Sequence, residues 1–161
     1  MKLSLIIPCY NEAASLPYLI ERCKRLIEIS NNIEIIFVDN GSTDNTMKIF
    51  KKLLSNNSRM HILHVQKNQG YGHGILSGLR EAKTELIGWT HADLQTDPCD
   101  VAEGLKYFSE NRKDIFVKGK RYGRPVFDQL FTFGMSIFET LLLKKNFWDV
   151  NAQPNLFSKE F

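Results

Sequence analysis

Short apolar runs alternate with amphipathic segments along the first 90 residues, and this alternation limits the possible folds more than any other feature of the chain. Leu3–Ile7 is almost entirely apolar and stops at Pro8, as a strand buried on both faces does. Between Leu16 and Ile27, apolar residues recur at three- and four-residue spacing with charged residues between them, which is typical of an amphipathic helix. Strands and helices that alternate in this way predict a parallel α/β sheet with right-handed crossovers.

The same pattern repeats further along the chain. It predicts strands at 33–38, 61–65, 85–90 and 115–118, and helices at 47–54, 74–82 and 101–111. Thr43 or Asp44 is expected to cap the helix at 47–54. A chain of 161 residues, 43% of them hydrophobic, can bury one core without metal or disulfide bonds. We therefore expect a single domain, 1–161, whose ligand lies at the carboxyl ends of the strands.

Charge and cysteine content exclude several classes of protein. The net charge is only +3, and the basic residues are scattered, so nothing indicates a nucleic-acid partner. Cys9, Cys23 and Cys99 form no C-x-x-C pair and are expected to be reduced thiols of an intracellular, cytoplasmic protein. The N-terminal apolar run is too short for a signal peptide, and no stretch reaches the roughly 18 apolar residues that cross a bilayer.

Polar side chains follow three of the predicted strands. They lie at Pro8–Glu12, Asp39–Ser42 and His91–Gln95. Taken alone, Asp39 fits a turn and Asp93 a helix cap. Together, the three segments predict a polar rim where the strands end, because the carboxyl ends of parallel strands meet at one edge of a sheet.

His91, Asp93 and Gln95 stand at alternate positions, and alternate residues of an extended segment point the same way. All three are therefore expected to face one cation. Carboxylate and amide oxygens suit Mg²⁺ or Mn²⁺, and the imidazole favours Mn²⁺ a little. A metal with so few protein ligands takes others from a substrate phosphate and neutralises a leaving diphosphate.

Four motifs, in order and spacing, resemble those of the family 2 glycosyltransferases of the GT-A fold. They are Leu5–Glu12, Val38–Thr46, Asn68–Gly72 and Ala92–Pro98. The last motif is most similar to the D-A-D-L-Q-x-x-P segment of the polyprenyl-phosphate, dolichyl-phosphate mannosyltransferase-like branch. The resemblance implies a Rossmann-like, mostly parallel sheet flanked by helices. It also implies an inverting transfer from a UDP- or GDP-linked sugar with Mn²⁺ or Mg²⁺.

The resemblance also implies roles for individual residues. A nucleotide-sugar site would include Pro8, Tyr10, Glu12, Asp39, Asn40, Ser42, Gly70, Ala92 and Asp93. The metal would be held by Asp93 and Gln95, with His91 beside them. Arg121 matches the G-x-R segment of the family and would contact phosphate, to which a guanidinium is well suited. Catalysis would then depend on Asp93, Arg121 and Asp149.

Two residues depart from the usual motifs. His91 stands where the first Asp of D-A-D is expected, and Asn40 stands where the second Asp of V-D-D is expected. A neutral imidazole still binds Mn²⁺, but it removes a negative charge, so weaker Mg²⁺ binding is expected. The branch usually carries an arginine after G-x-R for the acceptor phosphate. Here only Arg124 or Lys144 can substitute for it.

The acceptor is less well defined than the donor. A phosphate acceptor is already an anion and needs only cations to position it, and a polyprenyl phosphate is the preferred acceptor. A saccharide or protein hydroxyl would need a general base, and Asp149 stands where many members carry one; a structural turn explains Asp149 equally well. The departures at His91 and Asn40 also leave open a non-catalytic nucleotide-sugar-binding module.

The stretch Val126–Leu143 is apolar on more than one helical face and is followed by Lys144 and Lys145. One interpretation is that 126–145 contacts a membrane surface, at the cytoplasmic face. The preferred one is a core helix, or a helix covered by residues outside this chain. Because members of the family are generally longer, we expect a C-terminally truncated domain. It would have a nucleotide-sugar-binding half, 1–98, and a partial acceptor half, 99–161.

Overall fold

The computed structural model describes residues 1–55, 57–110, 112, 114–123, 126–144, 149 and 151–160. Its strands are β1 (Leu3–Cys9), β2 (Ile33–Asn40), β3 (Met60–Val65), β4 (Leu86–Trp89), β5 (Phe116–Lys118) and β6 (Asn155–Ser158). Its helices are α1 (Leu16–Ile29), α2 (Thr46–Leu54), α3 (Tyr71–Glu81), α4 (Asp100–Leu105) and α5 (Val126–Leu143).

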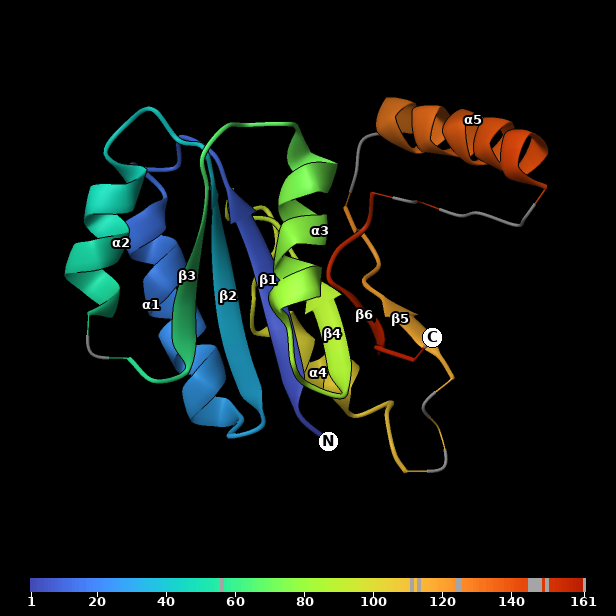
Figure 1. Ribbon diagram of the computed structural model, residues 1–161. Coiled ribbons are helices and arrows are strands. Elements are labelled where there is room, and N and C mark those ends of the chain that lie inside the picture. Colours follow the sequence, from blue (N-terminus) through green and yellow to red (C-terminus); the bar gives the residue numbers. More distant parts are fainter. Residues whose placement is uncertain are drawn as a thin grey trace.

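The strands form one six-stranded sheet in the order β3-β2-β1-β4-β6-β5 (Figure 1). The first four strands of the chain pair in parallel, whereas β6 runs antiparallel to both β4 and β5. This arrangement confirms the expected mostly parallel α/β sheet. Because β6 lies between β4 and β5, the segment 99–161 completes the sheet that 1–98 begins. A division of function between those two segments stays a prediction.

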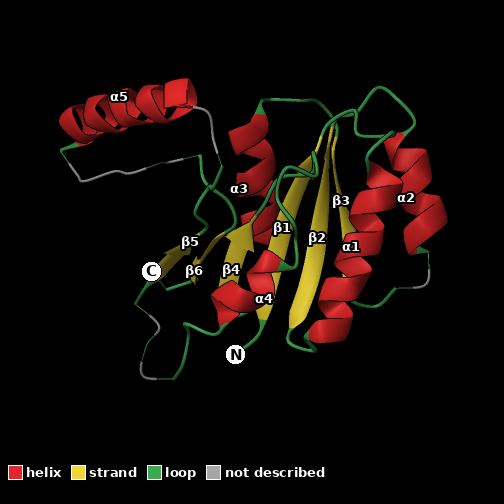
Figure 2. Cartoon of the chain, turned by 180° about the vertical axis from the view of Figure 1, so that it is seen from behind, coloured by secondary structure: helices red, strands yellow, loops and turns green. Residues whose placement is uncertain are grey.

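Helices cover both faces of the sheet, as the two views show (Figures 1 and 2). On one face, α1, α2 and α4 pack on the larger core, and on the other α3 packs over β1 and β2. Every residue of β1 is buried, which is why this strand reads as an unbroken apolar run. A Cβ at Gly78 of α3 would come within 2.5 Å of the Ile6 side chain, so glycine permits this close approach.

Several element boundaries differ from the sequence prediction. β2 continues to Asn40, so Asp39 and Asn40 end a strand instead of forming a turn. α3 begins at Tyr71, and α4 ends at Leu105. Asn45, instead of Thr43 or Asp44, occupies the N-cap of α2, although Asp44 Oδ1 still accepts a hydrogen bond from Thr46 N at 2.9 Å. The longer β2 places Asp39 and Asn40 at its carboxyl end, and the earlier start of α3 places Tyr71 in the first turn of that helix.

The expected core helix at 126–143 is wrong for this chain. α5 forms over the predicted range, but Phe131, Phe138 and Leu141 are 72%, 59% and 74% exposed. A contact with a membrane surface, and a cover formed by residues outside the chain, both remain as interpretations. Within the described ranges, no helix combines the length and apolarity needed to cross a membrane.

Candidate functional site

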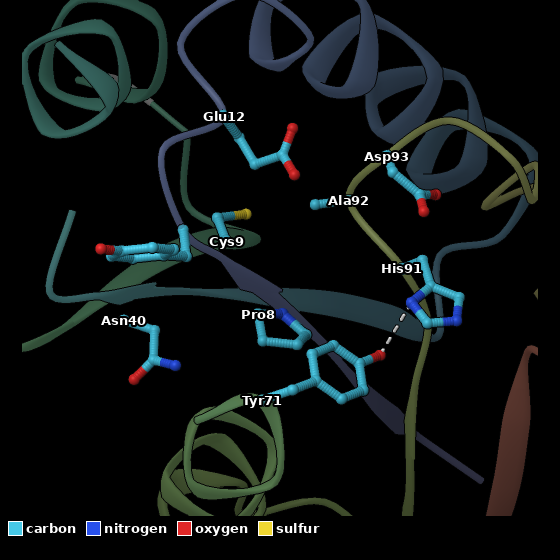
Figure 3. Close-up of a pocket in the computed structure, with 9 residues that line it drawn as sticks. Pro8, Cys9, Glu12, Asn40, Tyr71, His91, Ala92 and Asp93 are labelled. Carbon is cyan, nitrogen blue, oxygen red and sulfur yellow. Dashed lines mark hydrogen bonds between the residues drawn. The ribbon is translucent and has the colours of Figure 1, made fainter. Parts of the chain in front are cut away.

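A cavity of about 270 Å³ lies at the carboxyl ends of β1, β2 and β4, beside the first turn of α3 (Figure 3). Its lining is Pro8, Cys9, Tyr10, Glu12, Asn40, Tyr71, His91, Ala92 and Asp93. Three segments that are far apart in the sequence therefore meet here, as the alternation of strands and helices predicts. Cys9 and Tyr71 are the two lining residues that were not among the candidates.

The end of β1 is held in shape by the neighbouring turn. Asn11 has a positive φ of 56°, and its side-chain oxygen accepts a hydrogen bond from Thr43 N at 2.8 Å. Glu12 N donates to Thr46 Oγ1 at 2.9 Å. These contacts turn the chain sharply after β1 and direct the Glu12 side chain to the cavity (Figure 3). Cys9 is buried, and burial together with Glu12 raises the pKa of its thiol well above the usual value, so it is an unreactive part of the wall.

Asp39 does not line the cavity. It is fully buried, and Oδ2 lies 2.9 Å from His64 Nδ1, while Oδ1 accepts a hydrogen bond from Ser42 N at 3.2 Å. The Ser42 hydroxyl in turn accepts a hydrogen bond from Asn11 N at 3.0 Å. In this structure Asp39 and Ser42 therefore shape the turn behind the cavity. Their direct contact with a nucleotide stays a prediction.

The contact of His64 with Asp39 was not predicted from the sequence. The signal was available in the strand register, because Asp39 and His64 are direct partners on the parallel strands β2 and β3. Partners in register on adjacent strands project to the same face of the sheet. A predicted sheet order together with this register would have brought the carboxylate and the imidazole together.

Asn40 ties the end of β2 to the start of α3. Its Nδ2 donates to the Gly70 carbonyl oxygen at 3.0 Å and lies 3.4 Å from Asn68 Oδ1, which also accepts a hydrogen bond from Gly70 N at 2.7 Å. A carboxylate in this position has no proton to donate to a carbonyl. This requirement gives a physical reason for asparagine where the family motif has aspartate. Asn40 Oδ1 is buried and has no partner in the described part of the chain.

The geometry expected for His91, Asp93 and Gln95 is wrong. β4 ends at Trp89, and the loop after it bends, with Leu94 at a positive φ of 64°. Asp93 Oδ1 accepts a hydrogen bond from Gln95 N at 3.0 Å, and the exposed Gln95 does not line the cavity. His91 and Asp93 do line it together, from one side (Figure 3). The three residues are therefore not an extended ladder of ligands.

Tyr71 contacts His91 directly. The Tyr71 hydroxyl lies 3.0 Å from His91 Nδ1, and the two rings stack with centroids 5.3 Å apart (Figure 3). Burial and the nearby Asp93 raise the pKa of the Tyr71 phenol well above its usual value, so it keeps its proton near neutral pH. The sequence signal for Tyr71 was its place in the Gly70–Gly74 segment before a helix N-terminus, a region suited to phosphate.

The donor set fits a divalent cation. His91 contributes an imidazole and Asp93 a carboxylate to the same open cavity, which leaves coordination positions for diphosphate oxygens. Among the described residues, no cluster of three or more His, Cys, Asp or Glu side chains could hold a metal ion without such help. A cation here would therefore depend on its nucleotide.

Arg121 and Asp149 form an ion pair away from the cavity lining. Arg121 Nε donates to Asp149 Oδ2 at 3.1 Å, and Nη2 donates to the other carboxylate oxygen. Asp149 N donates to Ser136 Oγ at 3.1 Å, and its carbonyl accepts from Lys118 Nζ at 2.8 Å. The structure thus brings two of the three predicted catalytic residues to each other, whereas Asp93 lines the cavity. Arg124 lies outside the described residues.

The sequence model of glycosyl transferase family 2 matches residues 4–151. This chain belongs to glycosyl transferase family 2. The family member from Yersinia enterocolitica described as undecaprenyl-phosphate 4-deoxy-4-formamido-L-arabinose transferase is 40% identical over 106 residues. That match covers 62% of this chain and 31% of the relative. The chain spans about a third of the length of the curated relatives it matches.

Two solved structures share the fold over 99% of this chain. One is the mannosyltransferase PcManGT from Pyrobaculum calidifontis in complex with GDP-Man and Mn²⁺, with a TM-score of 0.72 and 19% identity over 45% of its length. The other is glucosyl-3-phosphoglycerate synthase from Mycobacterium tuberculosis with UDP, with a TM-score of 0.74 and 18% identity over 57% of its length. The GT-A fold predicted from the motifs is confirmed.

Proposed function

We propose that this glycosyltransferase chain moves a sugar from a nucleoside-diphosphate sugar to a polyprenyl phosphate, with inversion at the anomeric carbon. One observation carries the proposal. The cavity gathers Pro8, Tyr10, Glu12, Asn40, Ala92 and Asp93, which are candidates from all three strand ends, in a chain of family 2. The relative described as an undecaprenyl-phosphate sugar transferase supports the acceptor class.

Different residues of the cavity would bind different parts of the donor. Pro8, Tyr10 and Glu12 would hold the base and ribose along the end of β1, with Asp39 and Ser42 shaping that wall from behind. Gly70 is the N-cap of α3, and the positive end of the helix dipole at this N-terminus favours an anion such as the diphosphate. His91 and Asp93, and Gln95 after a change in the loop, would hold Mn²⁺ or Mg²⁺. When bound, the cation would neutralise charge that builds up on the departing diphosphate.

The transfer itself needs little chemistry from the chain. An oxygen of the acceptor phosphate attacks the anomeric carbon, and the bond to the nucleoside diphosphate breaks on the opposite side. Since a phosphate is already ionised, no general base is needed, and the work of the chain is to position the two reactants and exclude water. Cationic groups near Arg121 are the candidates for holding the acceptor phosphate.

The ion pair bears on the choice of acceptor. A hydroxyl acceptor would need Asp149 as a general base, but Arg121 binds both of its carboxylate oxygens, and a guanidinium there stabilises the ionised form and makes it a weaker base. This contact favours a phosphate acceptor over a saccharide or protein hydroxyl. An incoming phosphate would compete with Asp149 for the same guanidinium.

The exposed face of α5 supports a place at the membrane for this acceptor. Phe131, Phe138, Leu141 and Leu142 are each more than half exposed, and Lys144 follows the helix. Apolar side chains beside a lysine are suited to the boundary between acyl chains and headgroups. We propose that α5 contacts the cytoplasmic face of the membrane, where a polyprenyl phosphate presents its headgroup.

A direct assay tests the proposed function. The chain is incubated with radiolabelled UDP- and GDP-sugars, Mn²⁺ and undecaprenyl phosphate in detergent, and label is followed into the organic phase. The proposal predicts transfer from at least one donor and none without the lipid phosphate. Binding of a nucleotide sugar without transfer or donor hydrolysis would instead identify a non-catalytic binding module.

A further inference from the structure

The cavity holds a pair of rings that is fixed by two separate contacts. The Tyr71 hydroxyl lies 3.0 Å from His91 Nδ1, which sets the direction of that nitrogen. The rings also stack at 5.3 Å with their planes inclined by 23°, which sets the plane of the imidazole (Figure 3). Tyr71 comes from the first turn of α3 and His91 from the loop after β4, so the pair joins two walls of the cavity.

The remaining nitrogen of His91 is Nε2, and it has no hydrogen-bond partner among the residues that the structure describes. Nε2 is thus the imidazole nitrogen that is left to bind a ligand. An imidazole nitrogen binds a metal only when it carries no proton. A carboxylate has no such restriction, since either oxygen can bind in its usual ionised form.

The direction of the Tyr71–His91 hydrogen bond therefore affects how strongly His91 can bind a metal ion. If Nδ1–H donates to the phenol oxygen, the lone pair lies on Nε2 and is free for a cation. If the phenol donates to Nδ1, the imidazole proton lies on Nε2 and blocks it. Histidines that bind metals generally donate their other N–H to a nearby acceptor, which fixes the tautomer and the orientation of the ring.

We propose that Tyr71 is a positioning residue that accepts a hydrogen bond from His91 Nδ1–H and thereby presents Nε2 to the divalent cation. The role of the cation rests on the proposed function, whereas the tautomer is a property of the free protein. Tyr71 and His91 then act as one unit in the place of a single carboxylate. The unit supplies a ligand that is neutral and soft enough to suit Mn²⁺ better than Mg²⁺.

The tautomer can be measured without nucleotide or metal. The chain is labelled with ¹⁵N-histidine, and long-range ¹H–¹⁵N spectra are recorded near pH 8.5, where an ordinary imidazole is neutral. The proposal predicts a protonated Nδ1 and an unprotonated Nε2 at His91. Tyr71→Phe keeps the ring and the stack but removes the acceptor, so it should shift His91 toward the Nε2–H form. Tyr18→Phe, on the exposed surface of α1, should change nothing.

Either of two results would overturn the proposal: an Nε2–H tautomer in the unmodified chain, or an unchanged tautomer in Tyr71→Phe. Failure of the proposed function would give a different experimental result. If neither UDP nor GDP alters thermal unfolding, the donor site is wrong, and the tautomer spectra still decide the role of Tyr71.

A double-mutant cycle separates positioning from general damage. With saturating UDP or GDP, Mn²⁺ affinity is measured by electron paramagnetic resonance of the free ion. Tyr71→Phe should weaken Mn²⁺ binding by about tenfold or more, as loss of a ligand's hydrogen-bond partner commonly does. In the His91→Asp background the same change should have less than about a twofold effect, because a carboxylate has no tautomer to set. Equal losses in both backgrounds would overturn the proposal.

Discussion

Charged side chains are arranged differently in two regions of the molecule. One region is the cavity at the ends of β1, β2 and β4, and the other is the segment from Arg121 to Asp149. In the cavity, the carboxylates of Glu12 and Asp93 face an open space of about 270 Å³. In the second region, the carboxylate of Asp149 and the guanidinium of Arg121 neutralise each other. The cavity also lies at the end of a sheet with a hydrophobic core on each face, whereas α5 exposes apolar side chains such as Phe131 and Leu141.

This difference indicates how far each region is organised for a ligand. Carboxylates that face an open cavity favour a cation with its anionic partner, as the proposed metal–nucleotide complex requires. In the second region Arg121 and Asp149 are paired, and apolar side chains of α5 are exposed. The acceptor that we propose, a lipid phosphate, has a phosphate that would compete for Arg121 and acyl chains that would cover the apolar side chains.

The largest expected effect is on the cavity. Asp93→Asn should lower sugar transfer by about a thousandfold, because loss of a metal-binding carboxylate removes several kcal/mol of charge stabilisation. Initial rates at saturating donor measure the change. Asp97→Asn is the matched control in the same loop, because Asp97 Oδ1 accepts a hydrogen bond from Cys99 N at 3.0 Å and lies outside the cavity. Transfer by Asp93→Asn within tenfold of the parent would remove Asp93 from the catalytic site.

The next effect concerns the uncovered surface of α5. Replacing Phe131 and Leu141 together by glutamate should reduce binding to phosphatidylethanolamine–phosphatidylglycerol vesicles by at least about tenfold, because two exposed apolar side chains lose their transfer into lipid. Vesicle flotation measures the bound fraction. Leu76→Glu, on the half-exposed surface of α3, serves as the control and should bind like the parent. A parent chain that does not float at all would contradict the membrane contact.

The ion pair offers the sharpest test of the second region. Asp149→Asn should keep most of the transfer to polyprenyl phosphate, while the free energy of unfolding falls by about 1.5–3 kcal/mol through loss of charged hydrogen bonds to Arg121. Activity and urea unfolding are measured on the same sample. Loss of transfer with unchanged stability would make Asp149 a general base and favour a hydroxyl acceptor.

Substitution by aspartate should lower the free energy of unfolding more at Asn40 than at Asn68. Asn40→Asp replaces the amide that donates to the Gly70 carbonyl with a carboxylate that repels it, so unfolding should become easier by about 1–3 kcal/mol. Asn68→Asp keeps the oxygen that accepts from Gly70 N and should cost less than about 0.5 kcal/mol. Thermal unfolding compares the two variants, and equal losses would contradict the role given to the Asn40 amide.

The smallest effect is expected at Asp44, on the turn that follows β2. Slight desolvation raises the pKa of this carboxyl, but hydrogen bonds from Thr46 and Ala13 lower it by more, so the net pKa lies below its usual value. The ionised form therefore stabilises the fold above pH 4 or so, the ordinary pKa range of aspartate, and the effect is lost as the pH falls through the lowered pKa. Asp44→Ala should lower the free energy of unfolding by about 0.5–1 kcal/mol at pH 7 and by almost nothing at pH 2.5. An equal loss at both pH values would show that the charge is irrelevant.

Much of the first region was predictable from the sequence, since strands buried on both faces leave a strong apolar pattern and their polar ends must meet. The register between β2 and β3 was not used, so the Asp39–His64 contact was missed. The bend at Leu94 was also not predicted, because a positive φ at a leucine leaves no sign in a polar loop. It changed the expected arrangement of His91, Asp93 and Gln95.

The second region was less predictable for physical reasons. β6 is short and pairs antiparallel with β4 and β5, which are distant from it in the sequence. No local periodicity in the sequence predicts this pairing. Arg121 and Asp149 were each predicted to act on substrate, but their mutual ion pair depends on how the chain returns after α5. Sequence patterns indicate which charged groups are present; tertiary contacts decide which of them are already paired.

Thermal unfolding with nucleotides tests the central claim most directly. The chain and Asp93→Asn are each titrated with UDP and GDP, with and without Mn²⁺. At about a hundredfold excess over the dissociation constant, a bound nucleotide adds about 2.7 kcal/mol, which raises the Tm of a domain of this size by about 5–10 °C. The account predicts such a rise for at least one nucleotide, increased by Mn²⁺ in the parent chain and much less in Asp93→Asn. No rise with either nucleotide, with or without Mn²⁺, would contradict the assignment of the cavity as a nucleotide-sugar site.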